Sequence, residues 1–362
     1  MKTGTSVEAD FELQRSLLAG VSRTFALTIP TLPEHLERVV GNAYLLCRIT
    51  DTIEDAAALD VGEKLDFCER FIAVVAGRGD ASAFARDFAP RLAANASAEE
   101  RRLIAETPRV LALTTSFSAV ERDAIAECVA VMGRGMAAFQ RRKSLAGLAD
   151  LAEHARYCYV VAGCVGEMLT RLFLEYRPDL GPRREELMRL AVSFGQCLQM
   201  TNILKDFWED RAHGACWLPR NVFLAEGLDL AAVHPGDERF ARGYRRLLGL
   251  ARAHDETALT YTLAIPAHET GLRNFCLWAL YMAVLTQDKL LAHPGFARGD
   301  EVKISRRSVR LTVAWCRMAA RSNLLLKVSF ALLARRLPQA SIGDIASGAP
   351  TRGAGPETEV AR

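Results

Sequence analysis

Carboxylate and amide side chains recur at helical spacing in residues 199–210. Asn202, Asp206 and Asp210 are four residues apart, so on a helix they share one face, with Glu209 beside them. An acidic row among buried apolar groups is costly unless a cation neutralises it, and oxygen ligands of this kind suit Mg²⁺ together with substrate phosphates. A solvated acidic face is the alternative interpretation. The positions between the polar residues are apolar and able to pack: Ile203, Leu204, Phe207 and Trp208.

A second acidic cluster of the same design lies far upstream. Asp51, Glu54 and Asp55 also share a helical face, and they follow the mostly apolar run 43–48. Two such faces could meet across a cavity and hold several metal ions between them. A site of that kind would bind a diphosphate and stabilise it as a leaving group. The second cluster therefore favours a metal site over a solvated face.

Five motifs in this chain resemble those of the squalene/phytoene synthase family, from about residue 20 to about residue 310. One short acidic motif is weak evidence, whereas five in the right order are strong. The resemblance implies an all-α fold: a single-domain, isoprenoid-synthase-type helical bundle around a central apolar cavity, with the acidic motifs facing each other at its mouth. The motifs are Ser22-Arg-Thr-Phe25, Asp51-x-x-Glu54-Asp55, Tyr157-Cys-Tyr-Val-Val-Ala-Gly163, Asn202-Ile-Leu-Lys-Asp206 and Asp206-x-x-Glu209-Asp210.

The resemblance also implies a reaction and the residues that carry it. Two molecules of farnesyl diphosphate would condense head to head through presqualene diphosphate, with the diphosphates held by Mg²⁺. The implied catalytic tyrosines are Tyr44 and Tyr157. The implied metal ligands are Asp51, Glu54, Asp55, Asp206, Glu209 and Asp210. The implied substrate-binding residues are Ser22, Arg23, Phe25, Arg48, Gln199 and Asn202.

Two later segments bear on whether the product is then reduced. Arg273-Asn-Phe-Cys276 and Glu301-Val-Lys-Ile-Ser305 resemble the branch of the family that uses NADPH to make squalene, without a Rossmann motif. The alternatives are condensation without reduction, giving dehydrosqualene or a phytoene-type product, and a non-catalytic scaffold. Ala215 and Ser305 stand where relatives often carry arginine. The NADPH contacts that the resemblance implies are Lys205, Phe275, Cys276, Lys303 and Arg306.

The composition excludes several other classes of protein. The 362 residues are 50% hydrophobic and 25% charged, and the net charge of +3 is too small to indicate a nucleic-acid partner. Nine scattered cysteines without a CxxC pair predict reduced core thiols in a cytoplasmic protein. Residues 1–10 are polar and acidic, so no signal peptide is expected. Charges interrupt every long apolar run, which argues against a membrane-spanning helix.

Helical periodicity dominates the chain, and no sustained alternation indicates strands. We expect one catalytic domain over residues 1–337 and a disordered tail over 338–362, which is rich in Gly, Pro, Ala and Thr. Gly133, Gly135, Gly163 and Gly166 would either admit a bulky substrate close to the backbone or permit tight helix packing. The expected helical runs are 60–76, 82–94, a run from Pro108 to Arg142, 148–176, 236–264, 271–292 and 306–336.

Basic residues recur among large apolar ones in residues 306–336, and acidic residues are almost absent there. One interpretation is a core helix whose arginines lie on its solvated side. The other is an interfacial helix whose apolar side enters lipid while its arginines meet anionic headgroups. The second interpretation predicts weak peripheral contact with the inner face of the membrane.

Overall fold

The computed structural model describes residues 4–22, 24–92, 96–340 and 343. Helices form almost all of the ordered structure, which confirms the predicted all-α class. The only extended pairing among the described residues is an isolated parallel bridge between Leu148 and Pro219. The α-helices are α1 (Gly4–Val21), α2 (Phe25–Thr28), α3 (Glu34–Asp55), α4 (Val61–Val75), α5 (Ala81–Phe88), α6 (Ala98–Ala105), α7 (Thr107–Thr114), α8 (Ala119–Gln140), α9 (Leu151–Cys158), α10 (Cys164–Tyr176), α11 (Arg184–Lys205), α12 (Phe207–Ala212), α13 (Arg220–Leu224), α14 (Glu238–Ala264), α15 (Thr270–Ala292), α16 (Arg306–Ala319) and α17 (Asn323–Ala334). Shorter helical turns are η1 (Ile29–Thr31), η2 (Ala89–Arg91), η3 (Tyr159–Gly163), η4 (Pro178–Arg183), η5 (Leu230–Ala232) and η6 (Gly299–Val302).

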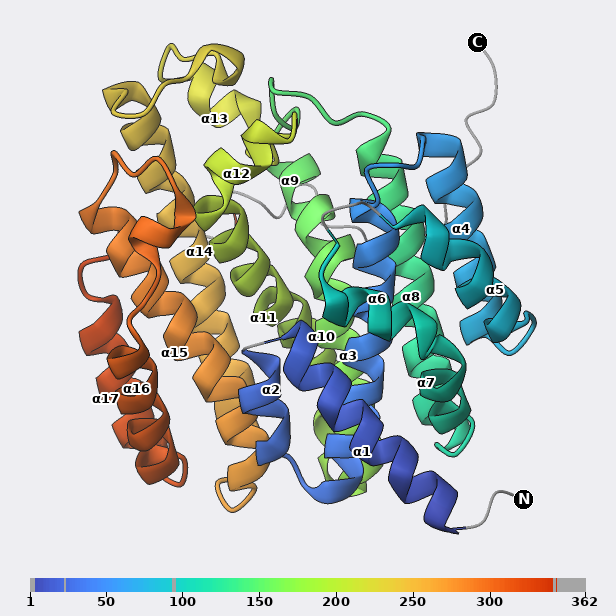
Figure 1. The fold of residues 1–362 in the computed structure, drawn as a ribbon. Coiled ribbons are helices and arrows are strands. Elements are labelled where there is room, and N and C mark those ends of the chain that lie inside the picture. Colours follow the sequence, from blue (N-terminus) through green and yellow to red (C-terminus); the bar gives the residue numbers. More distant parts are fainter. Residues whose placement is uncertain (1–3, 23, 93–95, 341–342, 344–362) are drawn as a thin grey trace.

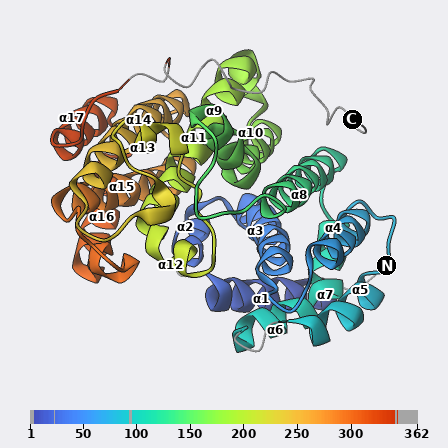
Figure 2. The same cartoon turned by 90° about the horizontal axis from the view of Figure 1, so that it is seen from above.

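A central group of helices is covered on two sides by the others. Seen from above, α3, α8, α10 and α11 lie around the centre, with α1 and α4–α7 on one side and α13–α17 on the other (Figure 2). Helix α11 packs against α10 and against α14, and α15 packs against both α11 and α14 (Figure 1). This arrangement holds α3 and α11 in the middle of the bundle. The first acidic motif ends α3, and the second follows the C-terminal end of α11.

Local capping signals divide the predicted run from Pro108 to Arg142 into two helices. The Ser118 side chain accepts a hydrogen bond from the backbone N–H of Glu121, and the Glu121 carboxylate accepts one in return from the N–H of Ser118. This capping box starts α8 and ends the helical run of α7. The single run is therefore corrected to α7 and α8.

The predicted helix over 148–176 is present as α9, η3 and α10, with a wider π-helical turn at Tyr159–Gly163. Gly166 of this run and Gly135 of α8 both lie against atoms of other segments. A Cβ on Gly166 would be 2.2 Å from the Ala191 carbonyl oxygen of α11, and one on Gly135 would be 2.5 Å from Val160 Cβ. Tight helix packing is thus the role of these two glycines. Gly133 is different, because a Cβ there would meet Ile72 Cδ1 at an ordinary 3.4 Å.

Residues 306–336 form two helices, so the prediction of a single helix was wrong. α16 ends at Ala319, and the Ser322 side chain then accepts a hydrogen bond from the N–H of Leu325 to start α17. Both helices pack outside α15 (Figure 1). Of the predicted tail, only residues 338–340 and 343 lie among the described residues, and the rest of that prediction falls outside them.

All nine cysteines are buried and free, as expected for reduced core thiols. Within the described part of the chain, the segments Leu151–Tyr176 and Thr270–Ala292 are long and apolar enough to cross a membrane by length and composition alone. Their most apolar windows are 50% and 61% buried inside the bundle, and core helices commonly have the same properties.

Candidate active site

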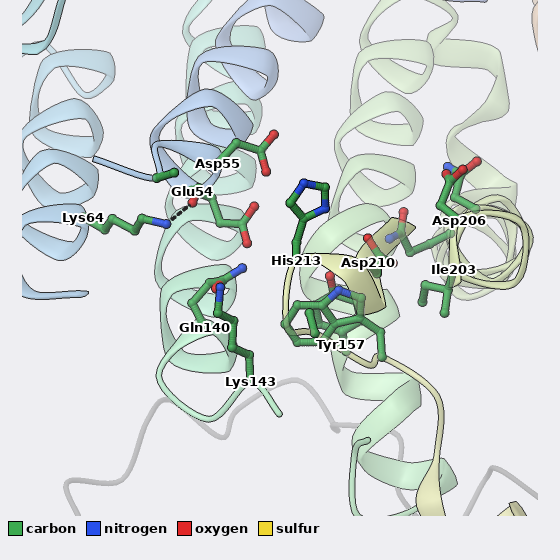
Figure 3. A pocket seen from close by; sticks show the side chains of 15 residues that line it. Glu54, Asp55, Lys64, Gln140, Lys143, Tyr157, Ile203, Asp206, Asp210 and His213 are labelled. Atoms are coloured by element: carbon green, nitrogen blue, oxygen red, sulfur yellow. Dashed lines mark hydrogen bonds between the residues drawn. The ribbon is translucent and has the colours of Figure 1, made fainter. Parts of the chain in front are cut away.

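A cavity of about 350 Å³ opens between the ends of α3, α4, α8, α9, α11 and α12 (Figure 3). Glu54 and Asp55 lie on one side of it, and Asp206 and Asp210 lie on the other (Figure 3). The structure thus brings the two acidic motifs together, although about 150 residues separate them in the chain. The lining residues are Glu54, Asp55, Ala57, Lys64, Gln140, Lys143, Tyr157, Gln199, Asn202, Ile203, Asp206, Asp210, His213, Ala215 and Trp217.

The first wall is the C-terminal end of α3. Its last residue, Asp55, stands where the helix dipole is negative, so carboxylates here are unfavourable without a compensating cation. Burial raises the pKa of Asp51 to about 7. The positive charge of Arg48 opposes this shift, and the negative charge of Asp55 adds to it. Burial, followed by the charge of Asp55, also raises the pKa of Glu54 well above its ordinary value. The Lys64 ammonium donates to the Glu54 carbonyl oxygen and brings one positive charge to this wall.

The second wall is the junction of α11 and α12. The regular helix is interrupted at Asp206, whose φ and ψ are −97° and 12°. The amide of Asp206 nevertheless donates to the Asn202 carbonyl oxygen at 2.8 Å, and the amide of Asp210 to that of Asp206 at 2.9 Å. These bonds keep Asn202, Asp206 and Asp210 on one face, as their spacing predicts. Burial raises the pKa of Asp210 to about 7, with the charges of Asp206 and Glu209 adding to the shift.

Tyr157 lies between the two walls (Figure 3). Its ring stacks on Trp217 with centroids 4.3 Å apart and planes 12° from parallel, and it meets Phe139 edge-on at 5.1 Å. Burial raises the pKa of the Tyr157 hydroxyl, and the charges of Glu54 and Asp210 raise it further. The hydroxyl is therefore a fixed, neutral hydrogen-bond donor beside both acidic motifs.

The donor set of this cavity fits Mg²⁺. Carboxylate oxygens from both walls, with the Asn202 amide, are the hard ligands that Mg²⁺ prefers. Burial is the main cause of the raised pKa values of Asp51 and Asp210, and neighbouring carboxylates raise both further. The described residues contain no group of three His, Cys, Asp or Glu side chains that could hold a metal ion by themselves. Mg²⁺ held by the carboxylates of this cavity would need further oxygen ligands, which waters and substrate phosphates can supply.

Glu209 does not line the cavity. Its Oε1 accepts a hydrogen bond from the Gly299 amide at 2.7 Å, and its Oε2 is buried without a partner. The neighbouring Lys205 pairs with Asp206, their Nζ and Oδ2 atoms being 2.9 Å apart. The structure therefore places Glu209 against the turn η6. Asp51, one turn before Asp55 on α3, is also absent from the cavity lining, so four of the six expected metal ligands line it: Glu54, Asp55, Asp206 and Asp210.

Several residues that the resemblance implies for substrate binding gather behind the first wall. Burial raises the pKa of Tyr44, while a hydrogen bond with Ser22 and the charge of Arg48 oppose that shift. The Tyr44 ring contacts Phe25 at 5.0 Å between centroids. Arg48 pairs with Glu100 and lies 3.9 Å from Asp51, measured from Nη1 to Oδ2. Arg23, also expected here, lies outside the described residues.

The expected NADPH contacts are not gathered at one place. Phe275 and Cys276 are 6% and 3% exposed and pack in the core, Phe275 edge-on against Phe173. Direct contact of these two side chains with a cofactor finds no support in this structure, because other side chains cover them. Lys303 and Arg306 are exposed at the end of the loop that follows α15.

Other polar cavity residues carry no recognisable sequence signal. Lys64 and Lys143 supply positive charge from α4 and from the end of α8, and Gln140 lies beside them (Figure 3). His213, directly after α12, projects into the middle of the cavity (Figure 3).

Comparison with known proteins assigns this all-α bundle, with its two acidic motifs at one cavity, to a family. The model of the squalene/phytoene synthase family matches residues 18–308, and the chain belongs to this family. It is 29% identical over 282 residues to a squalene synthase of Eremothecium gossypii, a match that covers 76% of this chain. The match covers 61% of the Eremothecium protein, so this chain spans about three fifths of that relative's length.

Solved structures show the same fold at low sequence identity. One is the complex of TcSQS with the ligand BPH1237, with a TM-score of 0.74, 24% identity and coverage of 94% of this chain and 96% of that chain. Another is a dehydrosqualene synthase in complex with a ligand, with a TM-score of 0.65, 18% identity and coverage of 88% and 99%. Both similarities show that the fold of the bundle is shared.

Proposed function

We propose that this protein is a squalene synthase that joins two molecules of farnesyl diphosphate and reduces the product. The observation that carries the proposal is the meeting of the two acidic motifs at one cavity, with Tyr157 between them. The match to a squalene synthase along 76% of the chain supports the same reaction. The Mg²⁺ and NADPH requirements are part of the proposal.

The acidic walls and the lysines bind the diphosphates. Glu54 and Asp55 on one side, with Asp206 and Asp210 on the other, would hold Mg²⁺, which when bound supplies the positive charge that stabilises diphosphate as it leaves. Lys64 and Lys143 add fixed positive charge at the same mouth. Tyr157 is held rigidly by its stack on Trp217, so its hydroxyl can donate a hydrogen bond to a diphosphate oxygen without reorganisation.

The prenyl chains need an apolar space behind this polar mouth. Several large apolar side chains on central helices keep partial solvent access although they pack against the core. A narrow channel lined by such groups would exclude water, which would otherwise quench the allylic cation formed when diphosphate leaves. The partly accessible side chains are Phe25, Tyr44, Val161, Val165, Leu169 and Phe194.

Reduction separates this proposal from the dehydrosqualene alternative. NADPH, when bound, supplies the hydride that quenches the final cation. Lys303 and Arg306 offer exposed positive charge for its phosphates, and Lys205 offers another on α11 beside Asp206. The turn that leads to Lys303 docks on α12 through Gly299 and Glu209, which brings this segment next to the acidic motif.

Product analysis tests the proposal directly. Purified protein is incubated with farnesyl diphosphate and Mg²⁺, with and without NADPH, and the extracted lipids are identified by mass spectrometry. We expect squalene with NADPH, and presqualene diphosphate or unreduced hydrocarbon without it. Dehydrosqualene in both reactions would support the non-reducing alternative, and no consumption of farnesyl diphosphate would contradict the proposed activity itself.

A further inference from the structure

The hairpin of α16 and α17 carries more than half of the large hydrophobic side chains that the described residues expose. Six of the eleven large hydrophobic side chains that the described residues expose belong to this hairpin. Leu324 and Met318 are 71% and 70% exposed, more than any of the other nine. Exposed apolar side chains concentrated on one element in this way point to a site of interaction with a partner or a membrane. The six residues are Leu311, Met318, Leu324, Leu325, Val328 and Leu332.

These side chains form stripes that point away from the bundle. On α17, Leu324, Val328 and Leu332 recur every four residues and are exposed, while Leu326 and Phe330 are buried on the opposite side. The Tyr281 hydroxyl of α15 donates to the Leu326 carbonyl oxygen at 3.0 Å and holds that buried side against the core. The helix is thus apolar on both sides, although α15 covers only one of them (Figure 1).

The charged side chains of the hairpin are all positive. Residues 306–336 contain eight cations and no Asp or Glu. All eight are exposed, and they lie along α16, at both ends of α17 and, as Lys327, within α17. Arg336 is 3.7 Å from Asp288 of α15 and Arg317 lies over the Trp278 ring. The eight cations are Arg306, Arg307, Arg310, Arg317, Arg321, Lys327, Arg335 and Arg336.

We propose that the outer side of this hairpin, defined by Leu311, Met318, Leu324, Val328, Leu332 and the cations around them, binds the surface of an anionic lipid bilayer. Apolar side chains would enter the boundary between headgroups and acyl chains, and the cations would meet anionic headgroups. We call this surface the hairpin face. The proposal does not depend on the chemistry of the cavity, whose lining includes residues of α9 and α12. These two helices lie apart from α16 and α17 (Figure 1).

A second copy of the chain is a poorer partner for the hairpin face. A symmetric dimer joins the same patch of both subunits, so it would place eight cations opposite eight cations. No carboxylate within residues 306–336 is present to offset that repulsion. An anionic bilayer supplies both the apolar layer and the negative charge that the hairpin face lacks.

Vesicle co-sedimentation of the full-length protein tests the charge requirement. We expect binding to vesicles of phosphatidylcholine with 30% phosphatidylglycerol at low salt, release at high salt, and little binding to phosphatidylcholine alone. Arg310→Glu combined with Arg321→Glu and Lys327→Glu should weaken the partitioning at least tenfold. The matched control is Arg78→Glu in the turn after α4, which should bind like the parent protein.

A fluorescent probe tests which surface enters the lipid. Because all nine native cysteines are buried, Val328→Cys introduces an accessible thiol for an environment-sensitive dye. Its emission should shift to the blue when anionic vesicles are added. The same dye at Leu224→Cys, on α13 and similarly exposed at 53%, should not respond. Circular dichroism of each variant, compared with the parent protein, checks that folding is intact.

Three outcomes would overturn the proposal. The first is that the protein does not sediment with anionic vesicles at low salt. The second is that the dye emission shifts equally at positions 224 and 328. The third is a monomer–dimer equilibrium without lipid that Val328→Cys or the charge reversals abolish. The last result would identify a second copy of the chain as the occupant of the hairpin face.

Discussion

Glu209 Oε1 accepts a hydrogen bond from the backbone amide of Gly299 at 2.7 Å. A Cβ on Gly299 would lie 2.9 Å from the Lys205 carbonyl oxygen and 3.1 Å from Asp206 Oδ1. The turn η6 therefore sits directly on the acidic segment, and only a residue without a side chain fits there. Because η6 leads into Lys303, Glu209 joins the second acidic motif to the segment proposed for NADPH.

This contact predicts different effects for two substitutions of Glu209. Glu209→Gln keeps an oxygen that can accept from Gly299, so both η6 and turnover should be nearly unchanged. Glu209→Ala removes the acceptor and should increase amide hydrogen exchange in residues 297–303 and raise the KM for NADPH. If Gln and Ala are equally damaging to turnover while exchange stays the same, the negative charge of Glu209 acts as a metal ligand instead.

Lys303→Ala should impair reduction more than condensation. The Lys303 side chain is exposed, and its carbonyl oxygen is held by Lys289 Nζ at 2.6 Å, so the loop should keep its shape without the ammonium. Presqualene diphosphate or unreduced products should accumulate, and the KM for NADPH should rise. Arg298→Ala, in the same loop and 70% exposed, is the matched control. Equal slowing of both half-reactions with unchanged NADPH affinity would remove Lys303 from the cofactor site.

Asp206→Asn should lower kcat on the order of 10²–10³-fold while the melting temperature stays close to that of the parent protein. The amide keeps the shape of the side chain but removes charge that matters most when diphosphate leaves. Asp66→Asn, whose parent side chain is 68% exposed on α4, controls for the loss of an acidic group elsewhere. Turnover near the parent value at saturating Mg²⁺ would contradict the metal-site assignment.

The raised pKa of Asp210 predicts how stability depends on pH. Its pKa of about 7 in the folded protein lies above 3.8, the ordinary value expected in the unfolded chain. The resulting stabilisation is fully present below pH 3.8 and is lost as the pH rises through 7, because the folded protein must then hold a buried charge. Without divalent cations, Asp210→Asn should therefore melt at a higher temperature than the parent at pH 8.

The comparison at low pH is the control for this prediction. At pH 4 the Asp210 carboxyl of the folded parent is protonated, so the melting temperatures of parent and variant should converge. Mg²⁺ should raise the melting temperature of the parent more at pH 8 than at pH 6, because it binds the ionised form. A difference between parent and variant that does not change with pH would mean that Asp210 titrates normally.

Local periodicity explains which parts of the site were predictable. The spacing of Asn202, Asp206 and Asp210 specifies a shared face, and the hydrogen bonds across the break at Asp206 preserve it. Glu209 points towards η6 and not into the cavity, and η6 is about 90 residues away in the chain. The positions of Lys64 and Lys143 depend likewise on how α4 and α8 pack around α3, which no short motif encodes.

The errors in the predicted fold have local causes. Ser118 and Ser322 are N-capping residues that start α8 and α17, and each divides what looks like one long apolar helical run. Phe275 and Cys276 belong to a motif shared with relatives, yet they are buried. The neighbouring Arg273 donates to the carbonyl oxygens of Ile265 and Ala320, so this motif joins the ends of α14 and α16 to α15.

The glycines of the central helices give a last prediction. A Cβ on Gly166 would lie 2.2 Å from the Ala191 carbonyl oxygen, which is backbone and cannot move without separating α10 from α11. Gly166→Ala should therefore destabilise the fold by roughly 1–3 kcal/mol. Gly133→Ala is the matched control on α8, where a Cβ has room and alanine should stabilise the helix by about 0.5–1 kcal/mol. Thermal melts of the two variants test the packing role. Unchanged melting temperatures combined with lost turnover would indicate instead that both glycines line a substrate channel.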